Sequence, residues 1–512
     1  MNFIFNPTSK KLFQNVVLFS GFWLLASCDQ PSKTNAPAPT TNEPQAQLPE
    51  PQKPEQLVFS RELLTRGTYA LDFENWQNLP ETEAILRDLF EGLTAYDAQG
   101  NVIPALAQSW QTQDNKSWLF ELRNDAKWSN GESLSAPQIV QHWQNLARSE
   151  NPQKRYLAYM NVQNAQQVLN GELPAEQLKT IAQNEHKLLI ELDKPTPFLP
   201  AMLAHVSQLI RHPNNPKLSN GAYRLAEQNA PENHLWLTKN PYYWAQEKVA
   251  FKQVDYQKLQ PAQPLQGLDV VLRPQTQSEQ IQNLPRLCSY FYLFNQHKGQ
   301  LAKKAVRKAL ARNKKSLLPS SLQQIEDNFE PPAMLEELLH NQQIDERHPL
   351  KLQLAYEQNH WKEQLAQQLI RSWSESDLIQ ASAQPMEREQ LLQNYAKGQF
   401  DLIGTGWCAD YNDPSAFLSL FYSQSPDNKT GYHNAQFDQL LEKALNSKNA
   451  TERQKFYQQA ESLLQKDYVA IPLHQYKLPV YLNSEHLQGY DLSNPVEVIY
   501  SKDLFRKVQI EK

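Results

Sequence analysis

The sequence predicts an α/β fold that is divided into at least two lobes. Residues 57–512 form a longer stretch than one hydrophobic core usually serves. Short β-rich runs with turn signals fill residues 57–245, whereas helical apolar spacing dominates between residues 295 and 400. Two strand-like runs enclose one of these helices, which indicates a βαβ unit and a parallel or mixed sheet in the second half.

The first 28 residues have the three parts of a secretory signal. Lys10 and Lys11 supply positive charge, "NVVLFSGFWLLA" is apolar but too short to span a membrane, and "LASC" ends at Cys28. This end is similar to the bacterial lipobox, in which cleavage leaves the cysteine as a lipidated N-terminus. The alternative is an ordinary signal peptide with an incidental cysteine. We expect residues 1–28 to be a lipoprotein signal and Cys28 to carry the lipid.

Residues 29–56 predict an extended spacer, because they contain many prolines and almost no apolar bulk. Lipid and spacer together indicate a protein that is anchored to a membrane surface and works in the aqueous phase. Asp29, directly after the cysteine, resembles the signal that keeps some lipoproteins on the inner membrane. We therefore expect the periplasmic face of the cell membrane, the inner membrane rather than the outer.

In the first half, turn residues separate the expected elements. "WLFELRNDAKWSNGESL" predicts a strand, a turn and an exit toward a helix, and "SAPQIVQHWQNLARSE" predicts that helix, with Pro137 in its first turn. "HKLLIELDKP" predicts another strand. "NGAYRLAEQNAPENHLWLTKNPYYW" predicts a hairpin that ends in an aromatic cluster.

In the second half, helices and strands alternate. The expected helices are "KKAVRKALARNKKSLL", "HWKEQLAQQLIRSWSES", "NAQFDQLLEKALNS" and "ERQKFYQQAESLLQKD". The expected strands are "PLKLQLAYE", "GQFDLIGTGW" and "YVAIPLHQY".

The sequence offers little that predicts catalysis or nucleic-acid binding. The net charge is −5 and no basic stripe is present, so nucleic acid is a poor partner. HExxH and GxSxG motifs are absent, "GTG" does not complete a phosphate-binding loop, and the histidines are not at metal-ligand spacing. We therefore expect a binding protein that is not an enzyme and has no cofactor or metal. Tryptophan and tyrosine at turn-adjacent positions are typical of a binding cleft.

The segment "GTGWCADYNDPSAFLSLF" (404–421) places Asp410 beside Cys408, among aromatic residues. The aspartate could hold a cation such as an ammonium group, or it could cap a helix starting near Pro414 or pair with a structural lysine. An acid–base pair with Asp413 has no further support. Cys288 and Cys408 are the cysteines left besides Cys28, and they are either bridged in an oxidising compartment or two buried thiols.

These residues resemble the oligopeptide-binding proteins of bacterial ABC importers, the family 5 extracytoplasmic solute-binding proteins. "GWCADYNDPSAFL" is similar to the family's signature. Further segments are similar to the family in the right order: "RDLFEGLTAYDAQGNVIPALAQSW" (87–110), "ELRNDAKWSNGESL" (121–134), "NGAYRL" (220–225), "LTKNPYYW" (237–244) and "LCSYFYLFNQ" (287–296). The resemblance covers roughly residues 57–512.

The resemblance implies a two-lobed periplasmic-binding-protein fold of the type II-like, large peptide-binding class, with a hinge between the lobes. The first lobe would comprise residues 57–286, with an inserted subdomain at about 92–215. The second lobe would comprise residues 287–485. Residues 486–512 would return to the first lobe.

The resemblance also implies the site. Asp410 would bind the α-ammonium of a peptide, and a Cys288–Cys408 disulfide would stiffen the strand that presents it. The peptide backbone would pair with residues of two segments, as a strand added between the lobes. These residues are Gly406, Trp407 and Cys408 in one segment and Gln77, Asn78 and Leu79 in the other. Tyr159 would line the site near the ligand, although a core position suits it equally.

Several positions depart from the family pattern. Gly404 and Tyr395 stand where basic residues hold ligand carboxylates, and Gln77 replaces an acidic residue. Lys362 falls at another basic or histidine position, so one anchor for a carboxylate survives there. The resemblance predicts recognition of the amine end and leaves the peptide length open.

The resemblance implies a monomer that delivers peptides to an inner-membrane ABC permease with its ATPase. The tether would keep the binder near that permease. The alternative is a specialised binder of the same fold, for a murein peptide or another amine-bearing ligand, or a sensor.

Overall fold

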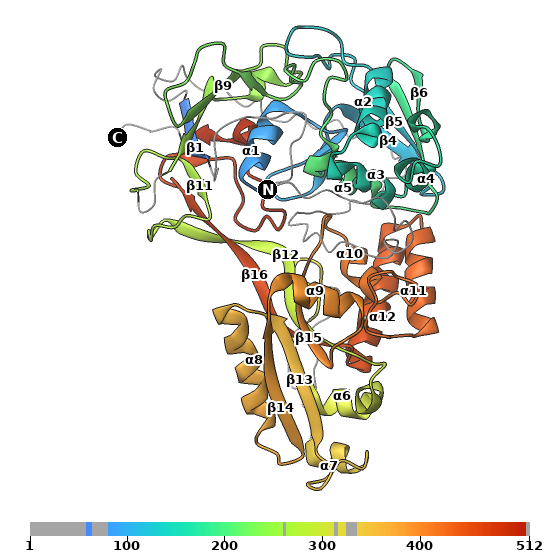
Figure 1. Cartoon of the computed structure of the whole chain (residues 1–512). Coiled ribbons are helices and arrows are strands. Elements are labelled where there is room, and N and C mark those ends of the chain that lie inside the picture. The colour runs from blue at the N-terminus through green and yellow to red at the C-terminus, as the bar shows by residue number, and fades with distance from the viewer. Residues whose placement is uncertain (1–57, 64–79, 260–262, 312–315, 324–334, 508–512) are drawn as a thin grey trace, which may run out of the picture.

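The computed structural model describes residues 58–63, 80–259, 263–311, 316–323 and 335–507 (Figure 1). Cys28, the spacer at 29–56 and the residues Gln77, Asn78 and Leu79 lie outside these ranges. The predictions for these residues stay predictions. Within the described residues, no helix combines the length and the apolar character that crossing a membrane requires.

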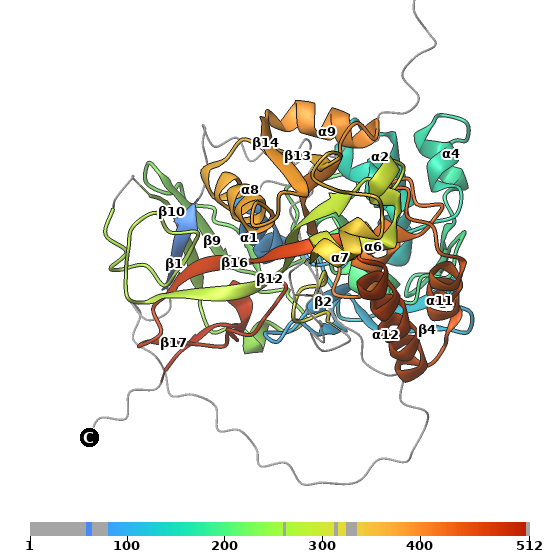
Figure 2. The same ribbon diagram turned by 90° about the horizontal axis from the view of Figure 1, so that it is seen from below.

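One ten-stranded sheet runs through both halves of the molecule. Its strands follow in the order β14 (Ile379–Met386), β13 (Leu350–Glu357), β15 (Leu402–Cys408), β12 (Ile281–Phe294), β16 (Ala470–Leu482), β11 (Val270–Leu272), β1 (Val58–Leu63), β10 (Gln253–Lys258), β9 (His234–Lys239) and β8 (Tyr223–Leu225). The long strands β12 and β16 pair antiparallel and lie side by side in both views (Figures 1 and 2). In Figure 1 they connect the upper and lower parts of the molecule. The register between them shifts from Pro285 to Ser289, where the pairing is interrupted. The predicted two-lobed α/β fold is confirmed.

The first lobe contains a second, four-stranded sheet with helices beside it (Figure 1). Its strands are β4 (Ala107–Thr112), β5 (Ser117–Leu122), β7 (Lys187–Glu191) and β6 (Thr180–Asn184). The helices of this lobe are α1 (Pro80–Leu89), α2 (Ala136–Arg148), α3 (Arg155–Tyr159), α4 (Ala165–Leu169) and α5 (Leu199–Leu203). Two-stranded pairs are formed by β2 (Thr94–Tyr96) with β3 (Val102–Pro104) and by β17 (Leu487–Gln488) with β18 (Phe505–Arg506). The predicted hairpin is formed by β8 and β9.

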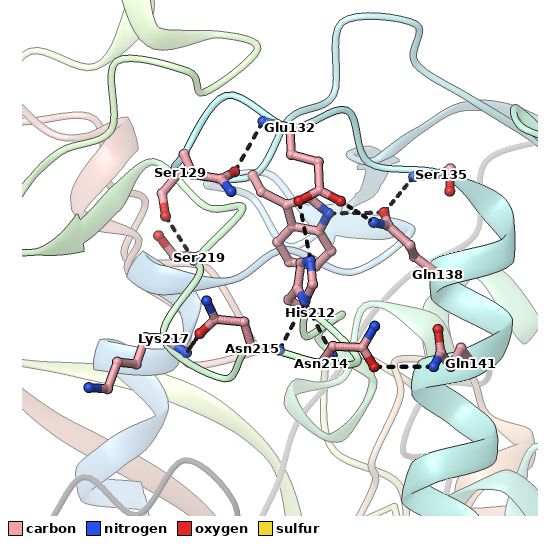
Figure 3. A network of polar contacts seen from close by, with 12 residues as sticks. Ser129, Glu132, Ser135, Gln138, Gln141, His212, Asn214, Asn215, Lys217 and Ser219 are labelled. Carbon is pink, nitrogen blue, oxygen red and sulfur yellow. Dashed lines mark hydrogen bonds and ion pairs between the residues drawn. The ribbon is translucent and has the colours of Figure 1, made fainter.

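A polar network fixes the loop that enters α2 (Figure 3). The Gln138 amide oxygen accepts hydrogen bonds from the Ser135 backbone N–H at 3.1 Å and from the Trp128 indole at 3.0 Å. The ring of His212 meets Trp128 edge-on at 4.9 Å, and its Nε2 lies 3.5 Å from Glu132. The network therefore joins the turn before α2 to the segment that precedes β8.

The second lobe contains the predicted βαβ unit. Strands β13 and β14 pair in parallel, and α8 (His360–Trp373) connects them. Asn359 begins α8 by accepting a hydrogen bond from the Trp361 N–H at 3.1 Å, and Trp373 is buried against the sheet at its other end. The other helices are α6 (Lys304–Leu310), α7 (Leu335–His340), α9 (Arg388–Ala396), α10 (Ser415–Leu418), α11 (Ala435–Asn446) and α12 (Ala450–Asp467).

Contacts join the four-stranded sheet of the first lobe to α11 of the second lobe. Asn115, in the turn between β4 and β5, donates hydrogen bonds to the Leu445 and Ser447 carbonyls, each at 3.2 Å. These carbonyls lie at the C-terminal end of α11, where the last backbone acceptors of a helix lack partners within it. The side chain of Asn115 thus caps a helix of the opposite lobe.

Candidate functional site

Strand β15 has one open edge. It pairs with β12 over its whole length, from Leu402 opposite Phe294 to Cys408 opposite Cys288. Its other edge pairs with β13 only at Leu402 and Ile403. Within the described residues, the strand therefore has no neighbour on that side from Gly404 onward. A strand edge of this kind can accept an added strand.

A disulfide ties β15 to β12 at the end of this open edge. Cys288 and Cys408 face each other across the ladder, with their Cα atoms 4.1 Å apart and 120 residues between them in sequence. The structure thus contains the bridge that the family resemblance implied. The bridge and the ladder together fix the position from which the chain continues to Asp410.

Asp410 is a carboxylate without a partner in the described structure. Its Oδ1 atom is buried and accepts no hydrogen bond, and burial raises the pKa of the side chain well above its usual range. The helix cap is instead made by Asp413, which accepts a hydrogen bond from the Ser415 N–H at 2.9 Å at the start of α10. Leaving a charge of this kind unpaired is costly, so a cation that entered here would be stabilised.

Aromatic side chains from both lobes meet next to this aspartate. Tyr411, from the second lobe, stacks on Phe198 of the first lobe at 4.4 Å with an interplanar angle of 9°. Tyr159 lies 6.3 Å from Tyr411 and 5.3 Å from Tyr156, measured between ring centroids. Tyr159 is 44% exposed, so it does not lie in the core. Asp410 therefore lies beside the contact between the lobes.

The glycines of "GTG" allow tyrosines to lie against the bare backbone of β15. A Cβ atom at Gly404 would collide with the Tyr290 hydroxyl, and one at Gly406 would come within 3.0 Å of the Tyr476 hydroxyl. Tyr290 therefore occupies the space that a basic side chain at position 404 would need. The neighbouring Trp407 is half-buried and donates its indole N–H to the Ala416 carbonyl at 2.7 Å.

The basic residue predicted as an anchor is already paired. Lys362 Nζ lies 2.6 Å from Glu357, and within 6 Å of the Trp361 and Tyr290 ring centroids, at 5.5 and 5.8 Å. Tyr290 therefore has the lysine near its ring and Gly404 next to its hydroxyl. Tyr395 is buried and donates its hydroxyl to the Asp427 carbonyl at 2.6 Å, which gives it a structural role.

Sequence reasoning missed a set of buried polar side chains near Tyr159. Tyr156, His205 and Arg87 each keep at least one buried polar atom that no other described residue meets with a hydrogen bond. The family segment "RDLFEGL" contains Arg87, but no local pattern indicates that these residues meet. Among the described residues, no group of three or more histidine, cysteine, aspartate or glutamate side chains is placed to hold a metal ion.

Comparisons with known sequences find relatives that are described as binding proteins. The sequence pattern of the middle part of bacterial extracellular solute-binding proteins, family 5, matches residues 101–317. A Haemophilus influenzae protein described as a binding protein is 44% identical, over 97% of this chain and 98% of that protein. The periplasmic murein peptide-binding protein MppA of Escherichia coli is 28% identical, over 85% of this chain and 91% of its own length.

Solved structures show the same fold. The unliganded open form of the murein tripeptide-binding protein MppA matches with a TM-score of 0.79 and 26% identity, over 88% of this chain and 98% of that one. Haemophilus influenzae OppA in complex with the peptide RPPGFSPFR matches with a TM-score of 0.62 and 24% identity, over 89% and 100% of the two chains. Of these two structures, the unliganded open form of MppA has the higher TM-score with this chain.

Proposed function

Because this chain belongs to family 5 of the bacterial extracellular solute-binding proteins, which includes the oligopeptide-binding proteins of ABC importers, we propose that it binds peptides between its lobes. The ligand adds as an extended strand along Gly406, Trp407 and Cys408. Gln77, Asn78 and Leu79 supply the facing backbone. Closure of the lobes buries the ligand, and Tyr159 lines the site.

The observation that carries the proposal is the unpaired carboxylate of Asp410 at the end of the open edge of β15. An ammonium group supplies both the charge and the hydrogen-bond donors that this carboxylate lacks. An extended peptide whose backbone pairs with β15 can bring its free amine to this position. The amino end is therefore the part of the ligand that the protein recognises.

Calorimetric titration with trialanine and with N-acetyl-trialanine tests this proposal. We expect Asp410→Asn to weaken trialanine binding by about 1.5 to 3 kcal/mol, roughly ten- to two-hundred-fold, because the charge-assisted hydrogen bond is lost. N-acetyl-trialanine has no ammonium, so the variant should bind it as the unmodified protein does. Equal affinity of both proteins for trialanine would show that Asp410 does not bind the amine.

We further propose that the protein is a monomer that delivers peptides to an inner-membrane ABC permease with its ATPase. The lipobox-like end at Cys28 and the spacer at 29–56 support anchoring to the periplasmic face of the membrane, and the related Escherichia coli protein is named as periplasmic. Cys28→Ala should move the protein from the membrane fraction to the periplasmic extract. Retention of this variant in the membrane fraction would contradict the anchor.

We propose that the first lobe comprises residues 57–286, with an inserted subdomain at about 92–215. The second lobe comprises residues 287–485. Residues 486–512 return to the first lobe. The relatives are binding proteins, and we propose the same, without catalysis, for this chain. Peptides that are recovered uncleaved after incubation would agree with this.

A specialised ligand is the second candidate. Gly404 and Tyr395 are not basic, and Lys362 is paired with Glu357, so the described residues offer few anchors for a ligand carboxylate. A murein peptide-binding protein is among the relatives. Native mass spectrometry of gently purified protein separates the candidates. Mixed peptides indicate general import, whereas a single amine-bearing species indicates a specialised binder or a sensor.

A further inference from the structure

Three buried polar side chains of the first lobe form a contiguous group, which we call the donor cluster: Arg87 of α1, Tyr156 of α3 and His205 after α5. Arg87 Nη1 donates a hydrogen bond to the Ala204 carbonyl at 3.1 Å, next to His205. The His205 ring stacks on Tyr156 with the centroids 4.5 Å apart and the planes 4° apart. None of the three residues is more than 5% exposed.

Each member of the donor cluster has an unused buried group that can donate a hydrogen bond. In the part of the chain that the structure describes, Arg87 Nε and Nη2, the Tyr156 hydroxyl and His205 Nε2 have no hydrogen-bond partner. His205 Nδ1 accepts the Ser207 backbone N–H at 3.2 Å, which places the proton of the neutral ring on Nε2. Burial lowers the pKa of His205 well below its usual range, so the ring is neutral. Among the described residues, no acceptor therefore lies at hydrogen-bond distance from these four atoms.

The unused atoms of Arg87 indicate the chemistry of that acceptor. Nε and Nη2 form one edge of the guanidinium, the fork that binds both oxygens of a carboxylate. The acidic neighbour Glu83 lies 3.9 Å from Nη2, which is too long for a hydrogen bond. Native proteins rarely leave several adjacent buried donors unmatched, so a carboxylate that arrives with a ligand is a physical explanation for this arrangement.

The donor cluster lies next to the proposed amine site. Tyr159 is the common neighbour, since its ring meets both Tyr156 and Tyr411, and Tyr411 follows Asp410 in sequence. Burial and then the charge of Asp410 raise the pKa of the Tyr156 hydroxyl, so the aspartate is close enough to act on it. A carboxylate acceptor and a set of donors thus lie near the same aromatic group.

We propose that the donor cluster binds the side-chain carboxylate of the ligand's first residue, so that the cleft favours peptides that begin with glutamate or aspartate. This inference rests on the proposed function, because it requires the amine of that residue at Asp410. The ammonium then pairs with Asp410 and the carboxylate with the fork of Arg87. The hydroxyl of Tyr156 and the Nε2–H of His205 supply further donors.

Calorimetric titration with Glu-Ala-Ala and Gln-Ala-Ala tests the inference, because the two peptides have nearly the same shape and differ in one charge. We expect the unmodified protein to bind Glu-Ala-Ala roughly ten- to one-hundred-fold more tightly. Tyr156→Phe should reduce this preference by several-fold, because a hydrogen bond to a charged carboxylate is stronger than one to a neutral amide. Arg87→Lys, which keeps the charge and loses the fork, should reduce the preference further.

The outcomes separate the two proposals. Equal binding of both peptides to the unmodified protein would overturn the donor cluster and leave the proposed function standing. A preference for Glu-Ala-Ala that survives in both variants would also overturn it. Binding of neither peptide would overturn the proposed function, and this inference with it.

Discussion

Glu83 gives a prediction about pH and stability. Burial raises the pKa of its carboxyl to about 7 from an ordinary 4.5, against the opposing charge of Arg87. In the unfolded chain the group releases its proton near pH 4.5. Between pH 4.5 and pH 7 the folded protein therefore binds more protons than the unfolded chain does. Stability therefore falls as the pH rises through this window. The interval from 4.5 to 7, at 1.36 kcal/mol for each pH unit, amounts to about 3 kcal/mol.

Glu83→Gln keeps the size of the side chain and removes its titration. We expect the unmodified protein to lose about 2.5 kcal/mol more stability than this variant between pH 5 and pH 8. His142 and His205, whose pKa values burial lowers, contribute in the opposite direction, and their contribution is the same in both proteins.

Urea midpoints of the two ligand-free proteins, measured at four pH values across this range, give the comparison. The two curves should converge at low pH and separate as the pH rises, with the variant more stable at pH 8. Parallel curves would refute the reasoning, because they would mean that Glu83 ionises in the folded protein as it does in water.

Three further predictions concern stability. Replacing Cys288 and Cys408 together by serine should lower the thermal midpoint, because a disulfide that closes a loop of 120 residues stabilises the fold by up to about 5 kcal/mol through chain entropy. An unchanged midpoint would show that the disulfide does not stabilise the fold. Gly404→Ala should cost about 1 to 3 kcal/mol through overpacking, part of which Tyr290→Phe in the same chain should recover. If Tyr290→Phe recovers no stability, the Tyr290 hydroxyl is not what opposes a larger residue at position 404. Glycine tolerates the backbone φ of 57° at Asn115, so Asn115→Gly removes the two side-chain hydrogen bonds to the other lobe without backbone strain. The urea midpoint should fall by the equivalent of about 2 kcal/mol. An unchanged midpoint would mean that these two hydrogen bonds do not contribute to stability.

Periodicity and turn residues predicted the elements well. The βαβ unit around α8, the hairpin of β8 and β9 and the helix after Ser135 all form where the sequence indicates. The type II-like, two-lobed fold followed from the resemblance and agrees with the solved structures. The segment "KKAVRKALARNKKSLL" was expected to be one long helix, whereas α6 covers only Lys304–Leu310 among the described residues. Local spacing does not determine where such a helix ends.

The site was less predictable, because its properties depend on contacts between distant segments. The sequence indicates Asp410 but not that Asp413 makes the helix cap, which depends on the local backbone at Ser415. It places Lys362 at a possible anchor but does not show that Glu357 already neutralises it. The donor cluster joins side chains from segments more than 40 residues apart, so no local pattern could reveal it. The roles proposed for Tyr159, Gly406 and Trp407 stay predictions.

The path of the chain has a consequence for biosynthesis. Strand β12 leaves the first lobe, β16 returns to it, and the final segment then completes it: Glu497 pairs with Arg286, Lys502 with Glu91, and Arg506 with Asp269. A chain that emerges from its N-terminus exposes most of the first lobe hundreds of residues before these partners exist. The first lobe therefore cannot form all of its contacts early in synthesis, and its exposed segments need protection from aggregation until then. The first lobe gains these three ion pairs only after residues 497–506 have been made.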